Sequence, residues 1–371
     1  MWYKYKTVMD AQETKTPHND STDLMLKTAV ESHEQVLDLA MGKADSPLQG
    51  FIAVHNTFLG PALGGTRLWK YANKEEALKD ALKLSKSMTY KCAIAGLPFG
   101  GGKGVIIYNP GTTDLEQVLQ LYAEKVSLLN GRFYTGEDVG MTEENVQYML
   151  RYSQFFIGKT GQAGDPSNFA ALSTFNSIKV ALHEKFGTPE IKGRKFVVKG
   201  VGKTGDELVR LLYLAGGEIF VSDTNPQTLD NILVKYPGIK EVDINRIEEK
   251  ETDVFCPCAL GDDITEKNVS KISASIIAGT ANNQLENDQV SELLFKKGIL
   301  YVPDYIANSG GLINVADELL QGGYSNSRVM SNIQKMKETL TTILYQSKIQ
   351  KLSPNRVADK IAESRFKRPN E

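Results

Sequence analysis

A glycine motif between a strand-like segment and a helical segment is the feature that most restricts the fold of this chain. Gly200, Gly202 and Gly205 form G-x-G-x-x-G, with KFVVK (residues 195–199) before the motif and DELVRLLYLAGG after it. In such a setting the first glycine makes a tight turn, the second lets a pyrophosphate approach the backbone, and the third lets the helix pack against the strand. A tight turn without a ligand would need the same glycines, but the flanking strand and helix favour a dinucleotide site.

The strand that follows this motif ends in an acid. EIFVSD closes at Asp223, 18 residues after Gly205. We expect this carboxylate to accept hydrogen bonds from the adenosine ribose hydroxyls. The next residues, Thr224, Asn225 and Pro226, supply no arginine for a 2′-phosphate. The motif therefore favours NAD over NADP.

Strand-like and helical segments alternate through the second half of the chain. VFCPCA, ASIIAG and ILYVPDY resemble buried strands, which predicts an α/β fold with a parallel, doubly wound sheet. Before about residue 165 the pattern differs, with a strand at 50–54, an amphipathic helix from about 74 and another helix at 115–129. A chain of 371 residues is long enough for two domains, and its tail after about residue 330 is helical and charged.

Two lysines are candidates for chemistry. Lys103 follows three consecutive glycines in AGLPFGGGKGVIIY, which we interpret as a loop that lets a ligand come close, and Lys91 lies in SMTYKCAIAG. A lysine can hold a carboxylate, or act as a general base when burial or another cation lowers its pKa. Asp138 in YTGEDVG is either the N-cap of a helix starting near Thr142 or a group that exchanges protons beside the lysines.

Composition excludes several other classes of protein. The net charge of −2 gives no basic field for nucleic acid. The cysteines are few, and Cys256 and Cys258 are too close together for a comfortable disulfide, as expected in a reducing compartment. The four histidines show no ligand spacing, so no metal site is predicted. Neither a signal peptide nor an apolar span is evident, so we expect a soluble, cytoplasmic protein without a membrane partner.

Seven segments together resemble the Glu/Leu/Phe/Val dehydrogenase family, most closely its leucine dehydrogenase branch. They run in order from about residue 30 to the tail: GPALGGTRLW, ALKDALKLSKSMTYKCAIAGLPFGGGKGVII, NGRFYTGEDVG, VKGVGKTG, CPCALG, IAGTANNQL and PDYIANSGGLINVADEL. The resemblance implies a catalytic and oligomerisation domain over 1–165, with helices at 335–371 packing back onto it. It implies an NAD-binding Rossmann domain over 166–334 and a substrate cleft between the two.

The resemblance also implies residue roles. Lys91 would bind the substrate α-carboxylate, Lys103 would activate water, and Asp138 would exchange protons with the amino group. Other residues would line the substrate site: Leu63, Gly64, Gly65, Gly136, Asn308, Leu312 and Val315. Beyond the glycine motif and Asp223, the implied cofactor contacts are Lys203, Thr204, Cys258, Ala259, Leu260 and Asn283.

Some positions depart from the family pattern. Ala170 stands where a threonine is common, and Gly104 replaces the threonine of GGGKT. Gly136 replaces the alanine usual in leucine enzymes, as in phenylalanine enzymes. One methyl group changes discrimination by only about 1–3 kcal/mol, so Gly136 permits a larger substrate without requiring one.

The sequence therefore predicts NAD-dependent, reversible oxidative deamination of a branched-chain L-amino acid to its 2-oxo acid and ammonia. An aromatic substrate, Phe or Trp, is the first alternative, and a nucleotide-binding regulatory protein without turnover is the second. Glutamate is disfavoured because the implied pocket is apolar. By resemblance we expect a homo-oligomer, either a dimer or an octamer. No role is assigned to residues 1–25.

Overall fold

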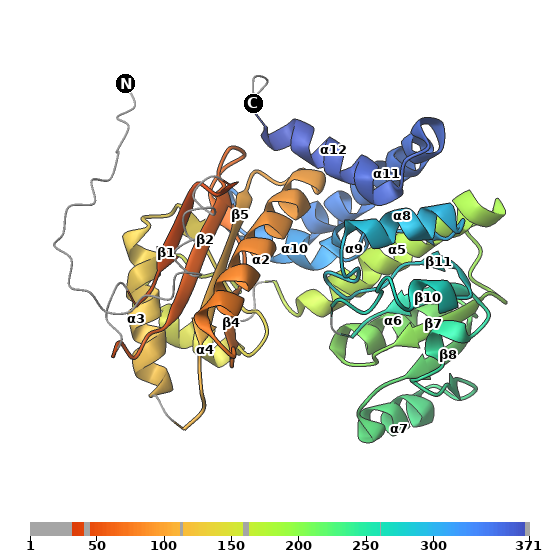
Figure 1. Ribbon diagram of the computed structural model, residues 1–371, viewed down its shortest axis with the longest axis horizontal. Helices are drawn as coiled ribbons and strands as arrows, with labels where there is room; N and C mark the ends of the chain where they lie inside the picture. Colours follow the sequence, from red (N-terminus) through yellow and green to blue (C-terminus); the bar gives the residue numbers. More distant parts are fainter. Residues whose placement is uncertain (1–31, 41–44, 112–113, 159–162, 260, 368–371) are drawn as a thin grey trace.

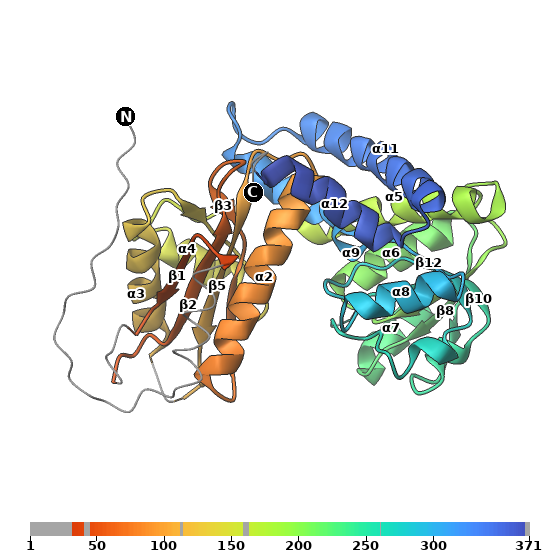
Figure 2. The ribbon, with the colours of Figure 1, turned by 45° about the horizontal axis from the view of Figure 1, so that its top comes forward.

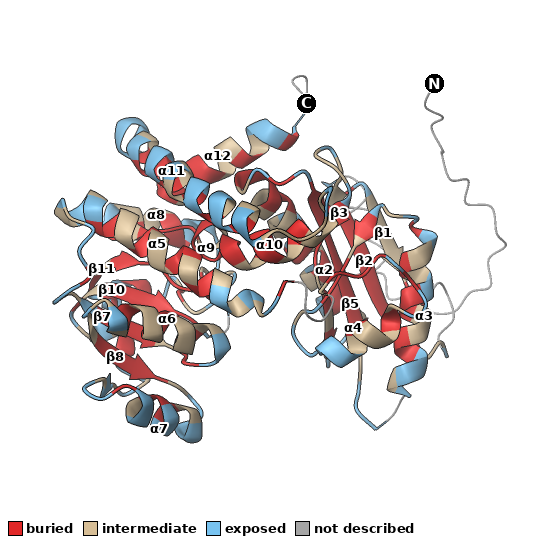
Figure 3. Cartoon of the chain, turned by 180° about the vertical axis from the view of Figure 1, so that it is seen from behind, coloured by how far each residue is buried: buried red, intermediate tan, exposed pale blue. Residues whose placement is uncertain are grey.

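The computed structural model describes residues 32–40, 45–111, 114–158, 163–259 and 261–367. These residues form two α/β halves, each built around its own sheet (Figure 1). Figure 3 shows the strands of both sheets buried beneath helices. Residues 1–25, for which no role was predicted, lie outside the described part of the chain.

The first half is a mixed six-stranded sheet covered by helices on both faces. Its order is β1-β2-β5-β3-β6, with β4 also paired to β5; β1–β2 and β2–β5 are antiparallel and the other pairs are parallel. The strands are β1 (Gln35–Asp38), β2 (Gly50–Asn56), β3 (Ala62–Leu63), β4 (Thr66–Trp69), β5 (Gly100–Ile107) and β6 (Phe133–Tyr134). Helix α2 (Lys74–Ile94) covers one face, and α3 (Leu115–Leu128) and α4 (Glu143–Met149) cover the other (Figure 1).

The second half is a parallel sheet of the doubly wound type, as predicted. Its order, β12-β11-β10-β7-β8-β9, reverses direction between β7 and β10, which defines a topological switch point. The strands are β7 (Lys195–Lys199), β8 (Glu218–Ser222), β9 (Lys240–Glu241), β10 (Thr252–Pro257), β11 (Ala274–Ile277) and β12 (Leu300–Tyr301). The helices are α5 (Pro166–Phe186), α6 (Lys203–Leu214), α7 (Pro226–Lys235), α8 (Asp288–Lys296), α9 (Asp304–Ala307) and α10 (Ser309–Ala316).

Two C-terminal helices, α11 (Asn326–Gln350) and α12 (Pro354–Phe366), follow the second half. Helix α12 lies across both halves and packs on α2 (Figure 2). The Tyr90 hydroxyl donates to Glu363 at 2.6 Å, and Arg365 donates to the carbonyls of Ala93 and Ile94 at 2.7 and 2.9 Å. The chain therefore returns to its first half, at the last turn of α2.

The glycine run before Lys103 is not a loop. Gly100, Gly101 and Gly102 lie inside strand β5. A Cβ on Gly101 would lie 2.1 Å from the backbone nitrogen of Thr89 in α2, and one on Gly102 would lie 2.7 Å from the ring of Phe133. The loop interpretation was wrong because α2 and β6 pack so closely on this strand that side chains are excluded there.

Within the described ranges, no helix is long and apolar enough to cross a membrane. The same part of the chain contains no cluster of His, Cys, Asp or Glu that could hold a metal ion. Cys92, Cys256 and Cys258 are buried and unpaired. Burial raises the pKa of the Cys92 thiol to about 12.

Candidate active site

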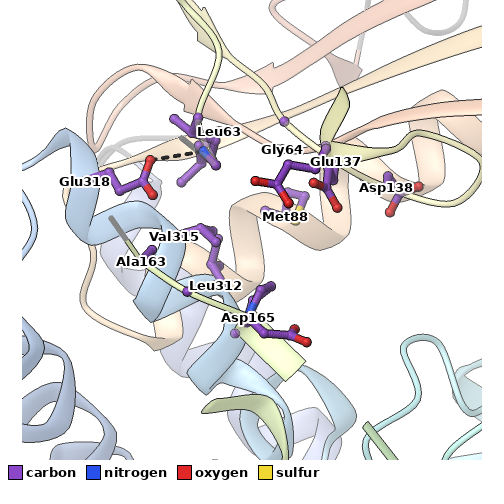
Figure 4. A pocket seen from close by; sticks show the side chains of 18 of the residues that line it. Leu63, Gly64, Met88, Glu137, Asp138, Ala163, Asp165, Leu312, Val315 and Glu318 are labelled. Carbon is purple, nitrogen blue, oxygen red and sulfur yellow. Dashed lines mark hydrogen bonds between the residues drawn. The ribbon is translucent and has the colours of Figure 1, made fainter. Parts of the chain in front are cut away.

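A cavity of about 850 Å³ lies between the two halves of the molecule (Figure 4). Many of the predicted substrate and catalytic residues line it: Leu63, Gly64, Gly65, Lys103, Gly136, Asp138, Leu312 and Val315. The predicted cofactor residue Lys203 also lines it. Sequence reasoning missed other lining residues, among them Met88, Glu137, Ile157, Asn282 and Glu318.

Lys103 and Asp138 form a buried ion pair in this cavity. Their Nζ and Oδ2 atoms are 3.0 Å apart, and only 4% of Lys103 is exposed. Burial lowers the pKa of Lys103 despite the attraction of Asp138. Burial alone would raise the pKa of Asp138, but Lys103 and Arg67 together hold it below its usual value. The N-cap of α4 is Thr142, so Asp138 is not the helix cap that was the alternative.

Arg67, which sequence reasoning missed, is the second partner of Asp138. Its Nε donates to Asp138 Oδ2 at 2.9 Å, and its Nη1 donates to Asp80 Oδ2 on α2 at 2.8 Å. The Tyr71 hydroxyl donates to the same Asp80 oxygen. The available signal was its place in GPALGGTRLW, one of the segments that resemble the family, to which no role for the arginine was attached.

Lys91 reaches the site from the last turn of α2. Its Nζ donates to Asn282 Oδ1 at 3.2 Å. Asn308 Nδ2 donates to the same oxygen at 2.8 Å, so the predicted Asn308 joins this group. Burial lowers the pKa of Lys91 to about 8, with nearby Lys103 adding to the effect.

The neighbouring residue Asn283, predicted as a cofactor contact, lies elsewhere. It has a left-handed backbone, with φ of 50°, and lines a separate cavity of about 340 Å³. Asn282 is the residue that joins the lysine group, and the cofactor contact of Asn283 stays a prediction.

The glycine motif has the geometry that a dinucleotide requires. A Cβ on Gly205 would lie 2.1 Å from the Gly200 carbonyl oxygen, so α6 packs against the turn as predicted. A Cβ on Gly202 would meet no atom within 4 Å, which leaves the turn open to a ligand. Gly202 caps α6 without a side-chain hydrogen bond, so the first backbone N–H groups of this helix can bind phosphate. Asp223 Oδ2 accepts from the backbone of Val201 at 2.8 Å, which holds this acid beside the turn.

The other predicted cofactor residues surround the same edge of the sheet. Lys203 is 79% exposed and lies 3.2 Å from Asp165, and Thr204 contacts Thr280 at 3.2 Å. Cys258 and Ala259 follow β10 at the switch point, where Ala259 lies against Gly200. Leu260 lies outside the described residues. Oδ1 of the buried Asn308 has no hydrogen-bond partner within the described chain, as expected of a group that contacts a ligand.

The two glycines that depart from the family pattern, Gly104 and Gly136, face larger neighbours. A Cβ on Gly104 would lie 2.0 Å from the Tyr122 hydroxyl, which is hydrogen bonded to Thr66 at 2.6 Å. A Cβ on Gly136 would lie 2.9 Å from Cγ1 of Ile157. In each case the side chain of this neighbour already fills the space that a Cβ would occupy. The third departure, Ala170, is buried in α5 beside Gly311.

The doubly wound sheet, the open glycine turn and the buried lysine–aspartate pair in the cleft define a dinucleotide-dependent oxidoreductase. Two family models match the chain: "Glu/Leu/Phe/Val dehydrogenase, dimerisation domain" over residues 33–154, and "Glutamate/Leucine/Phenylalanine/Valine dehydrogenase" over residues 221–365. The chain belongs to the Glu/Leu/Phe/Val dehydrogenase family.

Several relatives are similar over nearly their whole length. An L-tryptophan dehydrogenase from Nostoc punctiforme is 40% identical over 92% of this chain and 96% of its own. A leucine dehydrogenase from Bacillus cereus is 38% identical over 87% and 88%. A phenylalanine dehydrogenase from Thermoactinomyces intermedius is 38% identical over 91% and 92%. A crystal structure of L-tryptophan dehydrogenase from Nostoc punctiforme superimposes with a TM-score of 0.78 at 39% identity, covering 92% of this chain and 98% of that one.

The predicted family, fold class and NAD cofactor are thereby confirmed, and the protein is an NAD-dependent amino-acid dehydrogenase. This membership favours an enzyme over the alternative of a regulatory protein without turnover. The relatives act on side chains of different sizes, so membership alone does not select the substrate.

Proposed function

We propose that the protein catalyses reversible oxidative deamination of a branched-chain L-amino acid, Leu, Val or Ile, to its 2-oxo acid and ammonia. The observation that carries this proposal is the pairing of Gly136 with Ile157. The missing methyl at Gly136 does not enlarge the cavity, because Ile157 already occupies that position. The side-chain pocket therefore suits a branched aliphatic group.

The rest of the pocket supports an apolar substrate. Leu63, Leu312 and Val315 line the cavity together with Ile157. Glu318 also lines it, and its carboxylate accepts from the backbone of Gly158 at 3.0 Å (Figure 4). A second carboxylate on the substrate would meet this like charge, which disfavours glutamate.

Each reacting group has a role in the proposed chemistry. Lys91 binds the substrate α-carboxylate as a cation, while Asn282 and Asn308 fix its position. Bound NAD supplies the hydride acceptor for the hydrogen on the substrate Cα. Lys103, with its pKa lowered by burial, takes a proton from the water that attacks the substrate iminium carbon. Asp138 accepts a proton from the substrate amino group and returns it to the departing ammonia.

The cofactor site has its own division of roles. We propose that the N-terminus of α6 and the turn at Gly202 hold the pyrophosphate, and that Asp223 accepts from the adenosine ribose. A 2′-phosphate would meet the Asp223 carboxylate, so NAD is preferred over NADP. Thr204, Cys258 and Ala259 would complete the contacts at the carboxyl edge of the sheet.

An aromatic L-amino acid, Phe or Trp, is the second candidate. The similarity to tryptophan and phenylalanine dehydrogenases supports it, and so does the size of the cavity, about 850 Å³. Part of that volume faces Lys203 and Asp165, on the side of the cofactor turn, so it is not all available to the substrate side chain.

A substrate panel tests the proposal. Purified protein is mixed with NAD at alkaline pH, and NADH formation is followed with L-Leu, L-Val, L-Ile, L-Phe, L-Trp and L-Glu, with NADP as the control cofactor. We expect the highest kcat/KM for one of the branched-chain amino acids. A higher value for Phe or Trp would refute the branched-chain assignment and leave the chemistry intact. Lys103→Ala should lower turnover at least about 100-fold, as expected for loss of a general base, while NADH binding persists.

We also propose the division into a catalytic domain at 1–165 and 335–371 and an NAD-binding domain at 166–334. Helix α11 runs through the boundary at 334/335 and packs on α5 and α10 of the second half. The contact with the first half is made by α12, which packs on α2. A homo-oligomer, either a dimer or an octamer, stays a prediction. Sedimentation of the purified protein would test it, and a monomer at micromolar concentration would contradict it.

A further inference from the structure

Two cations bind the same oxygen of Asp138. Lys103 Nζ is 3.0 Å from Oδ2, and Arg67 Nε is 2.9 Å from Oδ2. Within the described residues, Oδ1 accepts no hydrogen bond, and Asp138 lines the substrate cavity. The carboxylate is therefore held by one oxygen, and the other is available to a substrate.

Arg67 also connects the three segments that carry the reacting groups. It contacts Asp138 in the loop after β6 and Asp80 in α2, the helix whose last turn carries Lys91. Its own strand, β4, pairs in parallel with β5, where Arg67 is opposite Val105, two residues beyond Lys103. Replacing Arg67 would therefore alter contacts of all three segments.

The charge on Arg67 matters most when the base is neutral. Lys103 has to lose its proton to activate water. The positive charge of Lys103, which favours the ionised form of Asp138, is then lost. Among the described residues, Arg67 and Lys91 are cations that still act on Asp138. Of these two, only Arg67 is hydrogen bonded to the carboxylate.

We infer that Arg67 is a positioning residue for the deamination: it fixes Oδ2 of Asp138 and keeps this carboxylate ionised when Lys103 gives up its proton, which leaves Oδ1 for the substrate amino group. This inference rests on the roles proposed above for Lys103 and Asp138. Arg67 itself does not line the cavity, so it acts through Asp138 rather than on the substrate.

The pH dependence of the reaction provides a test with a defined sign. The Arg67 cation lowers the pKa of Lys103 and that of Asp138. Arg67→Gln should therefore move the acid limb of the kcat–pH profile upward by about one unit, which is about a tenfold loss of kcat on that limb. Asp80 raises the pKa of Lys103, so Asp80→Asn should move the limb downward.

Arg194→Gln is the matched control. Arg194 pairs with Asp253 at 3.2 Å, and the two side chains are 26% and 22% exposed, close to the 23% and 21% of Arg67 and Asp138. This pair lies at the start of β7 and β10, away from the cavity. Its loss should leave the kcat–pH profile unchanged.

The experiment measures kcat and KM from pH 7 to 11 for the wild type and the variants, with NADH binding by fluorescence and melting curves alongside. We expect opposite limb shifts for Arg67→Gln and Asp80→Asn, and unchanged NADH affinity. An unshifted limb in a folded Arg67→Gln would overturn the inference, as would shifts of the same sign in both variants. If Arg67→Gln does not fold, Arg67→Lys takes its place, because it keeps the cation but loses the Nε–H that donates to Oδ2 of Asp138. A lowered kcat with an unshifted limb then supports the inference, and an unchanged kcat overturns it.

Lys103→Ala separates this inference from the proposed function. If Lys103→Ala loses turnover and Arg67→Gln shows no shift, only the role of Arg67 fails. If Lys103→Ala keeps full turnover, the proposed chemistry fails and the role of Arg67 fails with it.

Discussion

Replacing Ile157 with alanine should move the substrate preference toward aromatic amino acids. Ile157 is 6% exposed, lines the cavity, and fills the volume beside Gly136. The substitution removes the three side-chain carbons beyond Cβ. At about 0.8 kcal/mol per buried carbon group, this is roughly 2.4 kcal/mol of apolar contact, or about a 50-fold change in relative kcat/KM.

The assay is the ratio of kcat/KM for L-Leu to that for L-Phe and L-Trp, measured for wild type and Ile157→Ala. The ratio should fall by about 10- to 200-fold, the range expected for one or a few carbons in an apolar pocket. The same truncation costs about 2–5 kcal/mol of stability, so melting curves must show that the variant is folded at the assay temperature.

Ile52→Ala is a matched control, because Ile52 is fully buried in β2 of the same half and does not line the cavity. It should lose stability and keep the wild-type ratio. An unchanged ratio in folded Ile157→Ala would refute the argument that Ile157 limits the pocket. A similar fall in Ile52→Ala would show that general loosening causes the change.

Three further predictions concern packing and titration. Gly104→Ala should lower the free energy of unfolding by about 2–4 kcal/mol, because its Cβ would meet the Tyr122 hydroxyl. In urea titrations, adding Tyr122→Phe to this variant should recover part of the loss. Additive losses of stability in the double variant would contradict the contact. The pKa of Lys91 is lowered to about 8, so this lysine is charged below that pH. The KM for the amino acid should therefore rise as the pH increases above 8. A KM that stays constant up to pH 10 would argue against Lys91 as the carboxylate site. Burial raises the pKa of Asp359 to about 6, so the folded protein binds more protons than the unfolded chain between pH 4 and 6, and stability falls as the pH rises through that window. In Asp359→Asn the amide oxygen can still accept the hydrogen bond from the Tyr305 hydroxyl, and the variant should have a free energy of unfolding about 1–3 kcal/mol higher at pH 7. Denaturation at pH 5 and pH 7 measures this. An Asn variant that is less stable than the wild type at pH 7 would contradict it.

The parts of the fold that depend on local pattern were predictable from sequence. KFVVK, the glycine turn and the following helix lie where the pattern placed them, and Asp223 lies beside the turn. Local pattern placed the second part of β5 correctly but failed at Gly100, Gly101 and Gly102, because consecutive glycines signal a loop unless packing by another element excludes side chains.

The candidate site was only partly predictable. Lys103 and Asp138 are far apart in sequence and meet at 3.0 Å through sheet pairing, which the resemblance implied and periodicity alone could not. Arg67 was missed because its importance depends on the pairing of β4 with β5. The filling of the space at Gly136 by Ile157 likewise depends on which chain segments lie opposite each other.

The attachment of α12 to the last turn of α2 determines how the two halves can move. Rotation about this contact displaces each point in proportion to its distance from the axis. Lys91 lies in that same turn, close to the pivot, and it would hardly move. Such a rotation would change the spacing of the two halves at the cavity while the site for the substrate carboxylate stays nearly fixed.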